Sequence, residues 1–168
     1  EIADLDARLD QLAAALPAAA DTLPPAATFA APPAVTVPRA LAGLRVAVAR
    51  DAAFGFIYPA NLDTLAALGA DVAFFSPLAG EPVPDADALW LPGGYPELHA
   101  DTLAQNRAFF DALRAHHAAG RPILAECGGM LALFDTLTAS AGTAQRMAGL
   151  LPGGAVMQPR LAALGAQA

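Results

Sequence analysis

Cys127 is the only cysteine among the 168 residues, and its neighbours suggest that it is a reactive one. An apolar run, Pro122 to Ala125, precedes it closely, and Gly128 and Gly129 follow it. This pattern predicts a buried strand that turns sharply into a helix, because small neighbours allow a strained backbone to present the side chain. Backbone amides and the positive helix end at such a turn favour the thiolate, which attacks carbonyl carbon. The alternative is a buried cysteine that acts as a small apolar residue.

A second glycine pair, Gly93-Gly94, follows the apolar run Ala88–Leu91. Attack of a thiolate on an amide creates an oxyanion, which preorganised backbone N–H groups stabilise by several kcal/mol. The amide of Gly128 is one candidate donor, and an amide of Gly93 or Gly94 is the other. Taken alone, the glycine pair is equally consistent with a tight turn.

Acyl transfer to a cysteine also needs a proton donor, which is usually a histidine. His99 lies at the start of a predicted helix, and His116 and His117 lie in the last turn of another, where cations are favoured. None of the three is therefore assigned as the catalytic base. Glu126 adjoins the nucleophile, but successive strand side chains point to opposite faces, which is equally compatible with a structural role.

The elements that must position these residues alternate between strands and helices. Strands are predicted at 44–49, 72–75, 88–91 and 122–125, and helices at 61–68 and about 106–118. Near-continuous apolar strands joined by helices predict an α/β fold, a flavodoxin-like parallel sheet with helices on both faces. Ligands of such sheets bind at the carboxyl ends of the strands. Cys127 and the Gly93-Gly94 pair are therefore expected to share one crevice.

The region before residue 44 has a different character. Residues 1–16 carry apolar residues at helical spacing, and residues 17–43 are rich in Pro and Ala, which predicts a helix followed by a linker. We interpret 1–16 as the end of an upstream domain and 44–168 as an incomplete catalytic domain.

Composition narrows the possible partners. The net charge of −7 and pI of about 4.6 argue against nucleic acid and anionic membranes, which require a basic face. No apolar run approaches the roughly 20 residues of a membrane span. A single cysteine excludes a disulfide framework and a cysteine zinc cluster, so no metal is expected here, and a reducing cytoplasm fits best. All nine basic residues are arginines, which excludes a lysine-bearing phosphate loop and places any ATP chemistry elsewhere.

Four ordered motifs carry a resemblance to a known family. They are Ala49-Arg50-Asp51-x-Ala53-Phe54-x-Phe56-x-Tyr58-x-x-Asn61-Leu62, Phe74-Phe75-Ser76-Pro77-Leu78, Leu91-Pro92-Gly93-Gly94-Tyr95-Pro96-Glu97-Leu98 and Ala125-Glu126-Cys127-Gly128-Gly129. From about Leu44 onward the chain resembles the C-terminal class I glutamine amidotransferase domain of cobyrinic acid a,c-diamide synthases.

The resemblance implies a two-part enzyme of cobalamin biosynthesis. This domain would hydrolyse glutamine through a thioester on Cys127 and pass ammonia to an N-terminal synthetase domain. That domain would use ATP and Mg²⁺ to activate the a and c carboxylates of cobyrinate or hydrogenobyrinate, and no cofactor is expected in this chain. A sister branch that uses nickel sirohydrochlorin stays open as a substrate alternative, as does a homo-oligomer.

The resemblance also suggests a partner-facing loop at the end of the first strand. Its residues would be Arg50, Asp51, Phe54, Phe56 and Tyr58, and the alternative is an ordinary loop with aromatic packing.

One part of the family pattern is absent from this sequence. The family histidine belongs to a His-x-Phe-His-Tyr-Ser-like segment after the elbow, and no histidine follows His117. We therefore expect these residues to hydrolyse glutamine poorly and to expose a sheet edge. Two other functions stay open: a flavodoxin-like cysteine hydrolase or chaperone-like protein, and a non-catalytic docking module of the synthetase.

Overall fold

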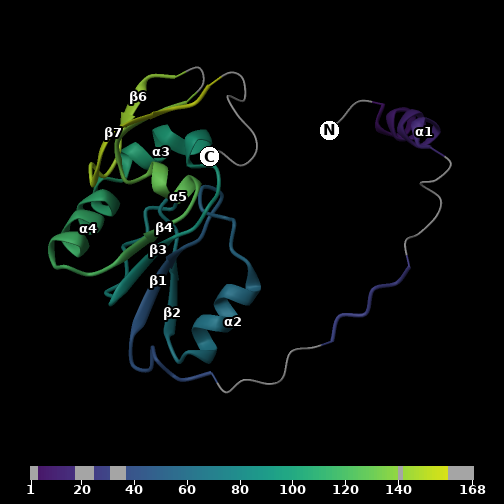
Figure 1. The fold of residues 1–168 in the computed structure, drawn as a ribbon. Helices are drawn as coiled ribbons and strands as arrows, with labels where there is room; N and C mark the ends of the chain where they lie inside the picture. Colours follow the sequence, from purple (N-terminus) through teal and green to yellow (C-terminus); the bar gives the residue numbers. More distant parts are fainter. Residues whose placement is uncertain (1–3, 18–24, 31–36, 140–141, 159–168) are drawn as a thin grey trace. The chain divides into compact units, whose positions relative to one another are not determined.

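The central sheet of the chain has four parallel strands in the order β2-β1-β3-β4 (Figure 1). The computed structural model describes residues 4–17, 25–30, 37–139 and 142–158. The strands are β1 (Arg45–Ala49), β2 (Asp71–Phe75), β3 (Ala88–Leu91) and β4 (Ile123–Ala125). All four predicted strands are present within one residue of the expected bounds.

Helices cover both faces of this sheet, because its strands are apolar on both sides. In β1, Val46 and Val48 pack toward α2 (Pro59–Ala67), whereas Ala47 and Ala49 belong to the cluster beneath α4 (Arg107–Ala118). Figure 1 shows α2 and α4 on opposite sides of the strands. The prediction of a parallel α/β fold with helices on both faces is confirmed.

The larger part of the core lies on the side of the sheet that α4 covers. Asn106 caps α4, its side-chain oxygen accepting a hydrogen bond from the Phe109 amide at 3.1 Å. Phe109, Phe110 and Leu113 are buried against the sheet, as their spacing predicts. Helix α2 begins two residues before the predicted start, because Pro59 fits the first helical position, where its missing N–H costs nothing.

The sequence did not indicate a second, three-stranded sheet in the order β6-β5-β7. Its strands are β5 (Phe134–Thr138), β6 (Ala144–Arg146) and β7 (Leu151–Val156). Strand β7 contains Pro152, Gly153 and Gly154. Because Pro and Gly are depleted in strands, the sequence did not predict this strand. Two further elements lie between β3 and α4: a short 3-10 helix (Pro96–His99) and α3 (Ala100–Gln105).

The N-terminal part forms a unit of its own, residues 1–36. Within it, α1 (Leu5–Ala15) confirms the predicted helix, and its leucines are exposed. The second unit begins at Val37, so the last residues of the predicted linker belong to the domain, where the Leu41 amide donates to the Leu68 carbonyl. Within the described residues, no helix is both long and apolar enough to cross a membrane.

Candidate active site

Cys127 lies on a strained turn between β4 and the one-turn helix α5 (Gly128–Leu131). Its backbone angles are φ 47° and ψ −117°, which a side chain with a Cβ rarely adopts. Strained residues persist where the surrounding structure over-determines them, and a nucleophile elbow is one such place. Cys127 is exposed rather than sealed in the core. The alternative of a buried apolar cysteine does not fit this position.

The glycines after Cys127 are required by close backbone packing. A methyl group at Gly129 would collide with the carbonyl oxygen of Leu91, at the end of β3, and would lie 2.6 Å from that of Pro92. At Gly128 it would collide with the carbonyl oxygen of Gly94. The elbow therefore rests directly on the backbone that follows β3.

The Gly93-Gly94 pair lies beside Cys127, as the positions at the carboxyl ends of β3 and β4 predict. A methyl group at Gly93 would stand 3.4 Å from the Cys127 Cβ, and one at Gly94 would collide with the carbonyl oxygen of Ala53. Three loops, after β1, β3 and β4, therefore meet at this point. Cys127 and the glycine pair thus lie together at these strand ends, as expected from the sequence.

The backbone amides of Gly128 and of the Gly93-Gly94 pair are candidates for the oxyanion hole. All three residues are buried, and their amides donate no hydrogen bond to another of the described residues. Buried amides are nearly always paired, so unpaired donors beside a nucleophile are suited to a ligand oxygen. A negatively charged oxygen would gain most from them.

Glu126 lies on the α2 side of the sheet rather than at this junction. Its carboxylate accepts a hydrogen bond of 2.7 Å from the indole nitrogen of Trp90, whose ring packs in the α2-side cluster. The side chain thus ties β4 to β3 on the α2 side. Trp90 is a partner that sequence reasoning missed, although its place in a buried strand required a partner for its N–H.

The five loop residues after β1 have different environments. Asp51 holds the loop together: one carboxylate oxygen accepts from the Ala53 amide at 2.8 Å, and the other accepts from the Ser76 hydroxyl at 3.0 Å and the Leu78 amide at 2.9 Å. Arg50 lies 3.7 Å above the ring of Phe74. Asp51 is committed to the domain itself, whereas Arg50 is exposed.

The aromatic residues of the loop differ in the same way. Phe54 is fully buried, with its ring centroid 6.3 Å from that of Phe109, so it has no surface with which to contact another domain. Phe56 and Tyr58 are 48% and 72% exposed, so their rings have surface with which to contact another domain. Of the five residues predicted to face a partner, Phe54 is in the wrong place, and the aromatic packing of the alternative interpretation accounts for it.

Phe56 also touches the candidate site. Its amide donates to the Gly93 carbonyl at 2.9 Å, and its ring stacks edge-on with that of Tyr95, with 5.0 Å between centroids. The loop after β1 is thereby fastened to the glycine pair. Tyr95 belongs to the quoted Gly-Gly-Tyr-Pro-Glu motif, but its stacking partner is 39 positions away in sequence, and no local pattern connects them.

Comparison with known proteins identifies the family. Residues 45–166 match the CobB/CobQ-like glutamine amidotransferase domain. The chain belongs to this family. The resemblance drawn from the four motifs is confirmed.

Relatives of this amidotransferase domain carry two similar names. Hydrogenobyrinate a,c-diamide synthase of Stutzerimonas stutzeri is 60% identical over 168 residues, which are 99% of this chain and 39% of that protein. Cobyrinate a,c-diamide synthase of Herminiimonas arsenicoxydans is 47% identical over 171 residues, with the same shares. That of Salmonella typhimurium is 46% identical over 124 residues, 74% of this chain and 27% of that protein. The chain thus spans about two fifths, or less, of the length of these relatives.

The three histidines of the amidotransferase domain lie at the ends of helices. The Nε2 atom of His116 is 3.2 Å from the carbonyl oxygen of Pro122, and burial lowers the pKa of this imidazole. Burial thus disfavours the cationic ring, which weakens the expected explanation of His116 by the attraction of a cation to the end of α4. His99 ends the short 3-10 helix, and His117 lies in the last turn of α4.

Among the described residues, no group of three or more His, Cys, Asp or Glu side chains is arranged to hold a metal ion. The chain contains no lysine, so a lysine-bearing phosphate loop has no counterpart in it.

Proposed function

We propose that this domain is the glutaminase part of an enzyme that amidates carboxylates of a corrinoid with glutamine as the nitrogen source. The observation that carries the proposal is the exposed, strained Cys127 beside unpaired amides, in a chain of the amidotransferase family. Nucleophile and oxyanion donors are the two groups that an acyl transfer must bring together.

The chemistry begins with attack of the Cys127 Sγ on the side-chain carbonyl carbon of glutamine. The carbonyl oxygen becomes an oxyanion, which the amide of Gly128 and an amide of Gly93 or Gly94 would bind. The C–N bond then breaks, ammonia leaves with a proton from a general acid, and a thioester remains on Cys127. Water cleaves the thioester, giving glutamate and the free thiol.

The proposed acceptor is hydrogenobyrinate or cobyrinate, amidated at its a and c carboxylates in cobalamin biosynthesis. This extension rests on the names of relatives that are two and a half times longer than the chain. ATP and Mg²⁺ would act in the part of those proteins that this chain does not align with, as would the corrinoid site. Of the two acceptors we propose hydrogenobyrinate, because a hydrogenobyrinate a,c-diamide synthase is 60% identical along 99% of the chain, against 47% for a cobyrinate a,c-diamide synthase along the same share.

We further propose that the 168 residues by themselves release glutamate slowly. The leaving amine needs a proton donor, and His116, the histidine with a resolved ring contact, is held by Pro122 on the far end of β4 from Cys127. Incubation with glutamine and measurement of glutamate tests this directly. Turnover equal to that of a full-length relative would contradict it.

Replacement of Cys127 by Ala in the full-length enzyme separates catalysis from docking. Glutamine-driven amidation should fall more than about a thousandfold, whereas ammonia-driven amidation should be retained. An equal loss of both activities would instead favour the docking module. A glutamine-like diazo-ketone should label Cys127 of the wild-type enzyme, and failure to label would favour a different cysteine hydrolase.

A further inference from the structure

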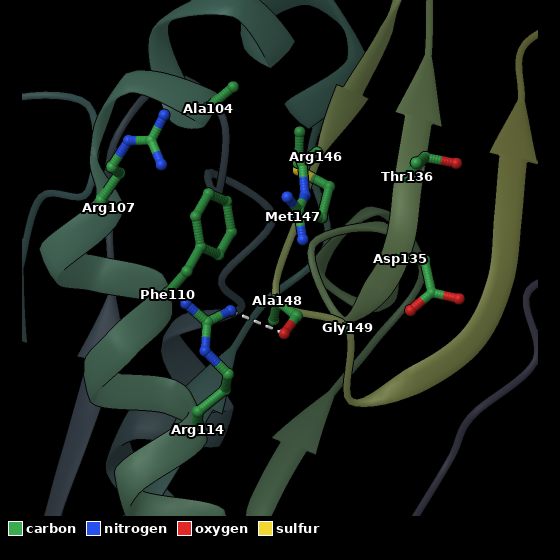
Figure 2. A pocket seen from close by; sticks show the side chains of 10 residues that line it. All are labelled: Ala104, Arg107, Phe110, Arg114, Asp135, Thr136, Arg146, Met147, Ala148 and Gly149. Atoms are coloured by element: carbon green, nitrogen blue, oxygen red, sulfur yellow. Dashed lines mark hydrogen bonds between the residues drawn. The ribbon is translucent and has the colours of Figure 1, made fainter.

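A cavity of about 580 Å³ lies between helix α4 and the second sheet. Its lining comes from five segments of the chain and includes none of the residues assigned to the candidate active site (Figure 2). The residues are Ala104, Arg107, Phe110, Arg114, Asp135, Thr136, Arg146, Met147, Ala148 and Gly149.

Three of the chain's nine basic residues line this one cavity, although the chain as a whole carries a net charge of −7. Figure 2 shows the Phe110 ring between the side chains of Arg107 and Arg114, with Arg146 reaching in from β6. Asp135 lines the cavity, and Asp111 pairs with Arg114 at 2.6 Å, so one net positive charge is left. The cavity is a cationic hollow in an acidic protein.

Two of the three guanidinium groups have no partner that accounts for them. Arg114 donates to the Ala148 carbonyl at 2.8 Å as well as to Asp111, so it has a structural role. Among the described residues, neither Arg107 nor Arg146 has an acidic group within ion-pair distance. Their charges are available to a bound anion.

The fold gives no local reason for a cation at Arg107. It is the first residue of α4, where the positive end of the helix disfavours a cation, and the first turn has no acidic residue. The spacing Arg107, Phe110, Arg114 places these side chains on one face of the helix, which the sequence could have indicated. Because the helix end disfavours the positive charge of Arg107 and the residue lines a cavity, a bound anion would explain its position.

The walls of the cavity strengthen its charges. Phe110, Met147 and Ala148 are 3%, 5% and 2% exposed, so the guanidinium groups stand against a buried apolar wall. Low-dielectric walls focus the field of nearby charges. Guanidinium groups bind carboxylate and phosphate oxygens in pairs, and the volume falls in the usual range of small-molecule sites.

From these observations we propose that the cavity binds a small polyanion with at least two carboxylate or phosphate groups, held chiefly by Arg107 and Arg146. Such a ligand would neutralise both guanidinium groups at once, and a monoanion would leave one unpaired. The site is separate from glutamine hydrolysis and does not depend on the proposed function.

The test is a calorimetric titration of the 168-residue chain with pyrophosphate and with citrate, with acetate as the monoanion control. We expect saturable binding of pyrophosphate or citrate and none of acetate. Tighter binding of pyrophosphate would assign the ligand to phosphates, and tighter binding of citrate would assign it to carboxylates. In the double variant R107Q/R146Q, binding should weaken by about tenfold or more, which corresponds to about 1.4 kcal/mol.

A control variant is needed to show that the weaker binding of R107Q/R146Q does not come from the change in net charge alone. Arg8→Gln is the control for the single variants R107Q and R146Q, which also remove one charge each, because Arg8 is an exposed arginine of α1, in the other unit of the chain. It should bind both polyanions as the wild type does. The variant R107K/R146K keeps the charge but loses the paired geometry of the guanidinium, and it should be intermediate. Circular dichroism confirms that each variant is folded.

Two outcomes would overturn the proposal. One is no binding of either polyanion to the wild type at 10 mM, on the order of the weakest affinity a specific site would show. The other is an equal loss in Arg8→Gln and in the single variants R107Q and R146Q, which would mean that general charge attracts an adventitious ion only.

Discussion

The elbow at Cys127 and the loop after β1 lie at the same edge of the sheet but are held in opposite ways. At the elbow, backbone packs on backbone, and glycines at 94, 128 and 129 leave no room for a methyl group. In the loop after β1, the carboxylate of Asp51 accepts hydrogen bonds from three donors. One region is specified by missing side chains and the other by one side chain that is present. Steric exclusion is intolerant of any addition, whereas hydrogen bonds can be removed singly, at a graded cost.

Gly129→Ala should have the largest effect on stability, because its methyl group would strike two carbonyls at the end of β3, and backbone cannot move aside as a side chain can. We expect the free energy of unfolding to fall by about 3 kcal/mol or more, measured by urea denaturation.

Gly43→Ala is a conservative control for that experiment. Unlike Gly129, Gly43 has a positive φ of +82°, but a methyl group there would meet nothing within 4 Å. Gly43→Ala therefore carries a backbone cost of about 1 kcal/mol and no steric clash. Equal losses for the two variants would show that close packing does not distinguish the elbow.

Asp51→Ala should have a smaller, graded effect. It removes the acceptor of three hydrogen bonds, each of which contributes about 1 kcal/mol, so we expect a loss of about 2–3 kcal/mol in the free energy of unfolding. Asp51→Asn retains one acceptor oxygen and should lose about half as much.

The exposed Asp111 provides the control for charge removal. Its pair with Arg114 is on the surface, with 71% of the Asp111 side chain accessible. Asp111→Ala should therefore cost less than about 1 kcal/mol. If Asp51→Ala cost no more than this, the loop would not depend on its carboxylate.

The same contrast explains what could be foreseen from the sequence. Apolar runs predicted the four central strands, and the elbow pattern placed Cys127 beside Gly93, because parallel strands share one carboxyl edge. The buried position of Phe54 could not be foreseen, since aromatic residues in a motif look alike whether they face a core or a partner. Strand β7 was missed because Pro152 and two glycines oppose strand propensity, and only pairing with β5 stabilises it. Patterns within one element and the shared edge of parallel strands could be predicted from the sequence, whereas side-chain contacts between distant elements could not.

Phe56 joins the two regions, and its replacement tests whether one depends on the other. Its amide holds the Gly93 carbonyl at 2.9 Å, and its ring leans on Tyr95. Phe56→Ala leaves the amide in place but removes the ring, which is half exposed. We expect a stability loss of only about 1 kcal/mol.

The effect of Phe56→Ala on catalysis should be more specific than its effect on stability. If the ring keeps the glycine pair in register with Cys127, the kcat of the full-length enzyme for glutamine should fall about tenfold, because the oxyanion donors shift, while KM changes little. Under the proposed function, ammonia-driven amidation would not use these donors and should be unaffected. Phe29→Ala, which removes a 90% exposed ring in residues 25–30, should change neither value. A change in KM with constant kcat would instead mean that the Phe56 ring contacts glutamine and that the two regions act independently.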